Sequence, residues 1–212
     1  MTIETFAPLN ALPFLFHAFT QRTDADTQAH DYEQRLVVSL GYSRFARAEQ
    51  IHGNGVAVVT CPGDYRGVDA LVTVTCGLPL LIRCADCAPI FLVDRATPAL
   101  ALIHCGKKGL FANVVRAAVA AMPSRPSDLL AVIGPCIGPC HYEVDLWSAI
   151  EQQLRAAGVR DIHNERRCTA CHLDRYFSYR AERGQTGRMF ALAALRESRR
   201  DKEPSLALSW KI

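Results

Sequence analysis

The sequence predicts an α+β protein in which mixed β-sheets are flanked by helices. Short runs of β-branched and bulky apolar residues outnumber the segments with helical periodicity, and these runs are clustered instead of alternating strictly with helices. The 212 residues contain no internal repeat, low-complexity tract or Gly/Ser linker. We therefore expect one domain that spans residues 1–212.

The expected strands and helices follow from the local pattern of apolar residues. Strands are expected where short apolar runs are bounded by Gly, Pro or Asp, at residues 12–19, 55–60, 70–74, 78–82, 90–93, 99–104, 129–133 and 205–210. Helices are expected where apolar residues recur at i, i+3 and i+4, at residues 31–40, 110–122, 145–157 and 187–199. Gly41 and Gly158 are placed to stop the first and third helices, and Pro123 ends the second.

Composition excludes several classes of protein. The longest uncharged run, residues 5–21, is interrupted by Pro8, Asn10, Pro13 and His17, which argues against a membrane span. No basic residue precedes this run, so a signal peptide is not expected and we predict a cytoplasmic protein. The net charge of +3, without an RNA-binding or zinc-finger pattern, predicts no nucleic-acid partner. The sequence gives no indication of the oligomeric state.

Nine cysteines are an odd number for a disulfide framework, which is usually short and exported. We therefore expect reduced thiols, some buried and some available as metal ligands.

Three metal-competent side chains stand at the ends of apolar runs. These are His52, Cys87 and His104. Two imidazoles and one thiolate leave a fourth position of tetrahedral zinc open, which is the ligand count of a catalytic site. Asp86, beside Cys87, could orient a ligand or act as acid or base.

Other arrangements of the cysteines remain open. Cys84-x-x-Cys87 and Cys168-x-x-Cys171 could form a four-thiolate structural site, although the gap between the pairs is long. A Cys87–His104 pair without metal would suggest a cysteine hydrolase. Cys136, in the turn-rich segment 134–140, is expected to be a small buried hydrophobe. The remaining histidines have no consistent partner spacing and are expected at the surface or in caps: His17, His30, His141, His163 and His172.

Seven ordered motifs resemble those of the YfiH-like family, whose members are labelled laccase-domain or polyphenol oxidase proteins, purine nucleoside phosphorylases or peptidoglycan editing factors. The resemblance extends from about Phe16 to Arg188. The motifs are Phe19-Thr20-Gln21-Arg22, Gln50-Ile51-His52-Gly53, Asp69-Ala70-Leu71-Val72-Thr73, Ala85-Asp86-Cys87-Ala88-Pro89-Ile90, Ile103-His104 with Gly106 and Gly109, Ile133-Gly134-Pro135-Cys136-Ile137-Gly138, and Phe177-Ser178-Tyr179-Arg180 with Thr186-Gly187-Arg188.

The resemblance implies that the family's zinc ligands fall on His52, Cys87 and His104. It also implies phosphorolysis of adenosine, inosine, guanosine and methylthioadenosine, and deamination of adenosine. The small-molecule partners would then be a purine nucleoside and phosphate. Copper is the second choice of metal. Because the family labels disagree, a cysteine- or zinc-dependent amidase that edits peptidoglycan precursors and a copper polyphenol oxidase remain alternatives. An inactive metal-binding module, in which Lys107 marks a lost activity, is a further alternative.

For this reaction we expect Asp86, Cys87 and His104 to be catalytic. Substrate is expected to contact Arg22, Gln50, Lys107, Arg180 and Arg188, since guanidinium groups suit the oxygens of phosphate. The sequence departs from the family at residues 23–26, where a glycine pair is replaced, and at Lys107, where the family has tryptophan. The second change exchanges a flat aromatic surface for a cation, which affects substrate choice more than metal binding.

Overall fold

The computed structural model describes residues 2–196, which form two six-stranded sheets and five α-helices. The first sheet has the order β1 (Ile3–Glu4), β2 (Leu15–Thr20), β12 (Met189–Leu195), β7 (Leu80–Cys84), β3 (Ala46–Ala48) and β5 (Gly63–Tyr65). The second has the order β11 (Asp161–Asn164), β10 (Leu129–Ile133), β8 (Ala88–Asp94), β9 (Ala99–Cys105), β6 (Ala70–Thr73) and β4 (Val56–Val58). The predicted α+β class is confirmed.

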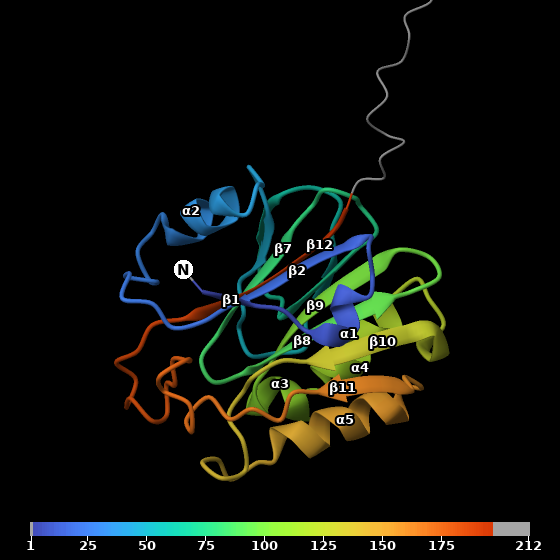
Figure 1. Ribbon diagram of the computed structural model, residues 1–212. Helices are drawn as coiled ribbons and strands as arrows, with labels where there is room; N and C mark the ends of the chain where they lie inside the picture. Colours follow the sequence, from blue (N-terminus) through green and yellow to red (C-terminus); the bar gives the residue numbers. More distant parts are fainter. Residues whose placement is uncertain (1, 197–212) are drawn as a thin grey trace, which may run out of the picture.

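The sheets pack face to face, with helices on both outer sides (Figure 1). Helix α2 (Tyr32–Ser39) covers the outer face of the first sheet. Helices α3 (Lys107–Phe111), α4 (Val114–Ala121) and α5 (Leu146–Ala156) cover the outer face of the second. The other helical elements of residues 2–196 are the short helix α1 (Ala7–Asn10) and the 3₁₀ turn Pro126–Asp128.

Strand β8 shows why this layering suits the sequence. All seven of its residues are buried. Ile90 and Leu92 face the helices, whereas Phe91 and Val93 face the other sheet, because successive side chains of a strand point to opposite faces. A strand buried on both faces needs a continuous apolar run, which the sequence provides.

Seven of the eight expected strands match β2, β4, β6, β7, β8, β9 and β10, with shifted ends. The eighth, 205–210, lies outside the described residues. Short strands β1, β3, β5 and β11 were not expected. Strand β11 pairs in parallel with β10 after the crossover through α5, so one βαβ unit is present in the second sheet.

The helix expected at 187–199 is wrong over its described part, because residues 189–195 form β12; residues 197–199 lie outside the described residues. A continuous apolar run fits a buried helix or a buried strand equally well. Here Phe190 and Leu192 pack under α2 while Met189 and Ala191 face the second sheet, so the segment is buried on both sides between β2 and β7.

The helix expected at 110–122 is divided into α3 and α4. Asn113 lies between them with φ 65°, a left-handed conformation that interrupts a helix. Helix α3 begins at Lys107, directly after β9, and this early start brings its first residues to the end of the strand where His104 lies.

His17, which was expected at the surface or in a cap, is buried in β2 and accepts a hydrogen bond from the backbone N–H of Phe6. Burial, and secondarily the charge of Arg196, lowers its pKa to about 4. No helix of the described part of the chain is long and apolar enough to cross a bilayer.

Candidate metal centre and cleft

The structure brings His52, Cys87 and His104 together, and we call these three residues the central site. Their ligand atoms all lie within 4.8 Å of one another. His104 is the penultimate residue of β9, and Cys87 directly precedes β8. Since β8 and β9 pair antiparallel with Pro89 opposite His104, the start of one strand meets the end of the other.

His52 reaches this point from the loop after β3. Its backbone has φ 62°, in the left-handed region that few non-glycine residues adopt. The rings of His52 and His104 meet edge to face, with centroids 4.9 Å apart. At Gly106 an added Cβ would lie 2.5 Å from the sulfur of Cys87, so a residue without a side chain is needed there.

The carboxylate of Asp69 makes hydrogen bonds to both His52 and His104. It is fully buried, and its Oδ1 lies 2.9 Å from Nδ1 of His104. The same oxygen accepts from the backbone N–H of His52, and Oδ2 accepts from that of Gly53. A carboxylate only accepts, so Nδ1 of His104 carries a proton and leaves Nε2 free to bind a metal.

The electrostatics of the central site favour a deprotonated thiol. Burial opposes ionisation of Cys87, but the charge and hydrogen bond of His104, together with the hydrogen bond of His52, lower its pKa overall. Burial would also disfavour protonated His104, but Cys87 and Asp69 raise its pKa. A thiolate is the form in which cysteine binds metal ions, so the donor set fits a soft or borderline cation such as zinc.

Asp86 binds segment 165–188, which connects β11 to β12. Its Oδ1 accepts from the hydroxyl of Thr169 at 2.7 Å, and its Oδ2 accepts from the backbone N–H of Arg180 at 2.9 Å. The peptide bond before Asp86 is cis. Both carboxylate oxygens are thus engaged in holding this segment.

A cleft of about 1130 Å³ opens over the central site. Its lining includes Asp86, Lys107, Lys108, Arg180 and Arg188. The whole lining contains six Lys and Arg side chains and four Asp and Glu side chains, so an anionic ligand in the cleft would meet an excess of positive charge.

Two of the cations share one carboxylate. Glu143 accepts from Nζ of Lys107 at 2.9 Å and lies 3.3 Å from the guanidinium of Arg180. These ion pairs are solvent-exposed and therefore easily exchanged for a ligand. The Arg180 guanidinium also lies 4.5 Å above the ring of Tyr142, which keeps its planar face toward an aromatic surface.

Arg188 approaches the cleft from the start of β12. Its guanidinium donates to the backbone carbonyls of Thr186 and Gly187, and its backbone N–H donates to the hydroxyl of Thr27. Gln50 is fixed differently: its side-chain amide donates to and accepts from the backbone of Arg83 in β7. Gln50 lines the cleft while both of its polar atoms bind the neighbouring strand.

The structure does not bring Arg22 to this cleft. Arg22 is not among the lining residues of the described part of the chain, and its guanidinium pairs with Glu182 at 2.8 Å. It also stacks on Phe177 at 4.4 Å. The side chain of Arg22 therefore contacts residues of segment 165–188.

Sequence reasoning missed several residues of the site. Asp69 carried a signal, since it stands just before an apolar strand, but nothing in the sequence pairs it with His104. Lys108, Tyr142 and Tyr179 also line the cleft, the last being 54% exposed. The tyrosines provide aromatic surface in the cleft that Lys107 also lines.

The proposed joining of Cys84-x-x-Cys87 with Cys168-x-x-Cys171 is wrong. Cys84 is buried in β7, and Cys168 and Cys171 lie close to Cys140 and His141 instead. Cys136 is fully buried, as expected, and burial raises the pKa of its thiol. All nine cysteines are free thiols in the structure.

The layered α+β fold, with an open two-histidine, one-cysteine centre at strand ends, defines the class to which the chain belongs: a metal-binding protein with a substrate-sized cleft. The family described as multi-copper polyphenol oxidoreductase laccase matches residues 16–145 and 142–196. The chain belongs to this laccase-like, YfiH-like family.

Named relatives agree with this assignment. The chain is 31% identical over 240 residues to purine nucleoside phosphorylase YlmD of Geobacillus stearothermophilus, a match that covers 92% of this chain and 87% of the relative. It is 32% identical to a purine nucleoside phosphorylase of Deinococcus radiodurans, over 88% of this chain and 85% of the relative. The crystal structure of YlmD from Geobacillus stearothermophilus superposes with a TM-score of 0.82 at 27% identity, covering 88% of this chain and 93% of that one.

Proposed function

We propose that the protein is a zinc-dependent purine nucleoside phosphorylase whose zinc ligands are His52, Cys87 and His104. The observation that carries the proposal is the position of Lys107, Arg180 and Arg188 around a cleft that has the central site in its lining. Phosphorolysis needs an anion and a nucleoside in one pocket, and this cleft offers cations, aromatic surface and metal ligands together. The names of the relatives support the same reaction.

The ligand set favours zinc over the copper in the family's description. Among the described residues, neither group of close Cys, His, Asp or Glu ligands contains more than two histidines. Multi-copper centres need more imidazoles than this, whereas two imidazoles and one thiolate suit an open zinc site. Zinc bound there supplies Lewis-acid polarisation at its open position.

In the proposed reaction, a phosphate oxygen attacks C1′ of the ribose. The bond between C1′ and the purine nitrogen breaks, its electron pair leaves with the base, and the base takes up a proton. Lys107, Arg180 and Arg188 bind the phosphate oxygens, because guanidinium and ammonium groups stabilise a doubly charged anion. Tyr179 offers a face for the purine.

Asp86 is assigned a positioning role. Its two oxygens hold Thr169 and Arg180, so it fixes the segment that brings the Arg180 guanidinium to the cleft. Cys87 and His104 act through the metal, and Asp69 sets the tautomer of His104.

The test is product analysis with adenosine, inosine, guanosine and methylthioadenosine, with and without phosphate. We expect free base and sugar 1-phosphate, formed only when phosphate is present. Arg188→Gln should raise the KM for phosphate about tenfold, while Arg95→Gln, an exposed arginine paired with Asp161, should not. Base release without phosphate would contradict the proposal, and inosine formed from adenosine would instead reveal the deaminase activity that the resemblance implies.

A further inference from the structure

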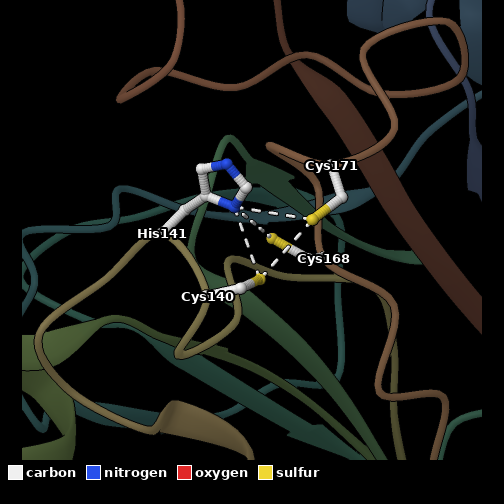
Figure 2. A group of neighbouring side chains, drawn as sticks. All are labelled: Cys140, His141, Cys168 and Cys171. Atoms are coloured by element: carbon white, nitrogen blue, oxygen red, sulfur yellow. Dashed lines mark hydrogen bonds between the residues drawn. The ribbon is translucent and has the colours of Figure 1, made fainter.

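A second group of ligands lies outside the central site. It consists of Cys140, His141, Cys168 and Cys171, which we call the loop site. Figure 2 shows the three sulfurs and the imidazole of His141 pointing toward one common point. The first two residues end the turn after β10, and the other two begin segment 165–188. Neither the proposed reaction nor the cleft uses these side chains.

The two segments are already held together by backbone hydrogen bonds. Cys136 and Cys168 form an isolated parallel bridge. The N–H of Cys136 donates to the carbonyl of Arg167, and the N–H of Thr169 donates to the carbonyl of Cys136, both at 3.2 Å. This bridge fixes the position of the two segments relative to each other, and so brings the four side chains close together.

The separations within the loop site fit the edges of a tetrahedron. The sulfurs of Cys140 and Cys171 are 3.5 Å apart. Nδ1 of His141 lies 3.3, 3.5 and 3.8 Å from the sulfurs of Cys140, Cys171 and Cys168. Bonds of about 2.3 Å to sulfur and 2.0–2.1 Å to nitrogen give tetrahedral edges of about 3.6–3.8 Å.

Hydrogen bonding cannot account for this arrangement. A ring nitrogen has either one proton or one lone pair, so Nδ1 of His141 can make one good hydrogen bond and not three. A disulfide does not account for it either. The sulfurs of Cys140 and Cys171 are not bonded, and a bond between them would leave Cys168 and the imidazole unused.

The surroundings of Cys168 support a thiolate. Its sulfur is buried and accepts a hydrogen bond of 3.2 Å from the backbone N–H of Gly138. A Cβ at residue 138 would lie 2.5 Å from the ring of Trp147, so this close approach of the backbone requires glycine. Backbone N–H groups that donate to metal-bound sulfur stabilise its charge and orient the ligand.

We propose that the loop site binds a second zinc ion, which fastens segment 165–188 to the turn after β10. Four protein ligands close the coordination sphere, so this zinc is structural, whereas the three ligands of the central site leave a position open. The set of three thiolates and one imidazole is soft and selects zinc over hard cations.

The position of the loop site indicates that the zinc would hold segment 165–188 in place. Segment 165–188 forms no helix or strand; its only regular feature is the isolated bridge at Cys168. Two groups of this segment donate hydrogen bonds to Asp86. Thr169 directly follows the ligand Cys168, and Arg180 lies further along the same segment. Fixing Cys168 and Cys171 therefore fixes the segment that brings Arg180 to the cleft.

Metal counting tests this proposal without reference to activity. The full chain, purified without added metal, should contain about two zinc ions per molecule by elemental analysis. Cys87→Ser should retain about one, and the double variant Cys140→Ser/Cys171→Ser should also retain about one. The matched control Cys61→Ser/Cys76→Ser removes two exposed thiols elsewhere and should retain about two.

Cobalt(II) substitution identifies the ligands. In Cys87→Ser the remaining metal should show intense sulfur-to-cobalt charge-transfer bands and tetrahedral ligand-field bands, as expected for three thiolates. This measurement does not depend on the folding of the loop variants. A single zinc in the wild type that Cys87→Ser removes would overturn the proposal, as would a disulfide between Cys140 and Cys171 in protein purified without reductant.

Discussion

The central site and the loop site use the same two residue types on different scaffolds. Cys87 and His104 stand at strand ends and His52 in a loop, and the fully buried Asp69 holds this group through hydrogen bonds to His52, Gly53 and His104. The loop ligands stand on irregular chain, and three of the four are exposed. A site held by the core is ordered before metal binds, whereas at the loop site only the Cys136–Cys168 bridge orders the chain and a bound metal adds to that order. The difference predicts that losing metal disables chemistry at one site and local order at the other.

The largest expected effect separates the two sites by activity. Cys87→Ala should lower kcat/KM for inosine phosphorolysis by roughly a thousandfold or more, since several kcal/mol of transition-state stabilisation are lost with the metal. Cys140→Ala should lower it about tenfold, because Arg180 remains in the chain but is held less firmly. Steady-state kinetics with zinc content measured on the same samples tests the comparison. Equal losses from the two variants would contradict it.

The next effect concerns the support behind the central site. Asp69→Asn keeps the shape of the side chain but removes the charge that faces His104. We expect zinc affinity to fall about 10- to 100-fold, in line with the loss of other carboxylate partners of metal-bound histidine. Competition with a chromophoric chelator measures the change. Asp128→Asn, at an aspartate paired with Arg125 near the surface, is the control and should leave affinity unaltered.

Lys107 tests substrate choice at the rim of the cleft. Lys107→Trp should lower the KM for adenosine about tenfold, because stacking a base on an aromatic ring contributes roughly 1–3 kcal/mol. It should also raise the KM for phosphate, since a cation is lost. Arg116→Trp adds the same ring at an exposed position of α4 and should change neither constant. An unchanged or higher KM for adenosine in Lys107→Trp would refute the stacking argument.

The smallest expected effect is on local order. Cys171→Ser should accelerate amide hydrogen exchange across residues 165–188 about tenfold, which corresponds to about 1.4 kcal/mol of local opening free energy. Exchange in β8 and β9 should not change, because the central site and the core remain intact. Cys61→Ser replaces another exposed cysteine and serves as the comparison. Unchanged exchange in Cys171→Ser would show that the segment is held without the metal.

Much of the fold could be predicted from the sequence because the central strands are continuous apolar runs. Two elements were predicted wrongly for the same reason: the local pattern of apolar residues does not determine them. Residues 189–195 read equally well as a buried helix, and only their neighbours β2 and β7 decide the matter. The break at Asn113 depends on one backbone conformation that the apolar periodicity does not reveal.

The three central ligands could be proposed from strand ends and from family motifs, and the structure places them together. The loop site could not. Cys168-x-x-Cys171 was visible as a pair, but its partners Cys140 and His141 are adjacent residues in a turn, where they look like an unrelated thiol and a surface histidine. The ion pair of Arg22 with Glu182 could not be predicted either, since it depends on a distant segment folding back.

The place of β12 in the first sheet has a consequence for how the protein is made. Leu15 of β2 pairs with Leu195, while Met189 on the same strand pairs with Cys84 of β7. As β12 separates β2 from β7, the first sheet cannot close until residue 195 has left the ribosome. Contacts between such distant residues slow folding. Until then the nascent chain carries two incomplete half-sheets with unpaired inner edges, so folding is completed after nearly all of the described chain has been synthesised.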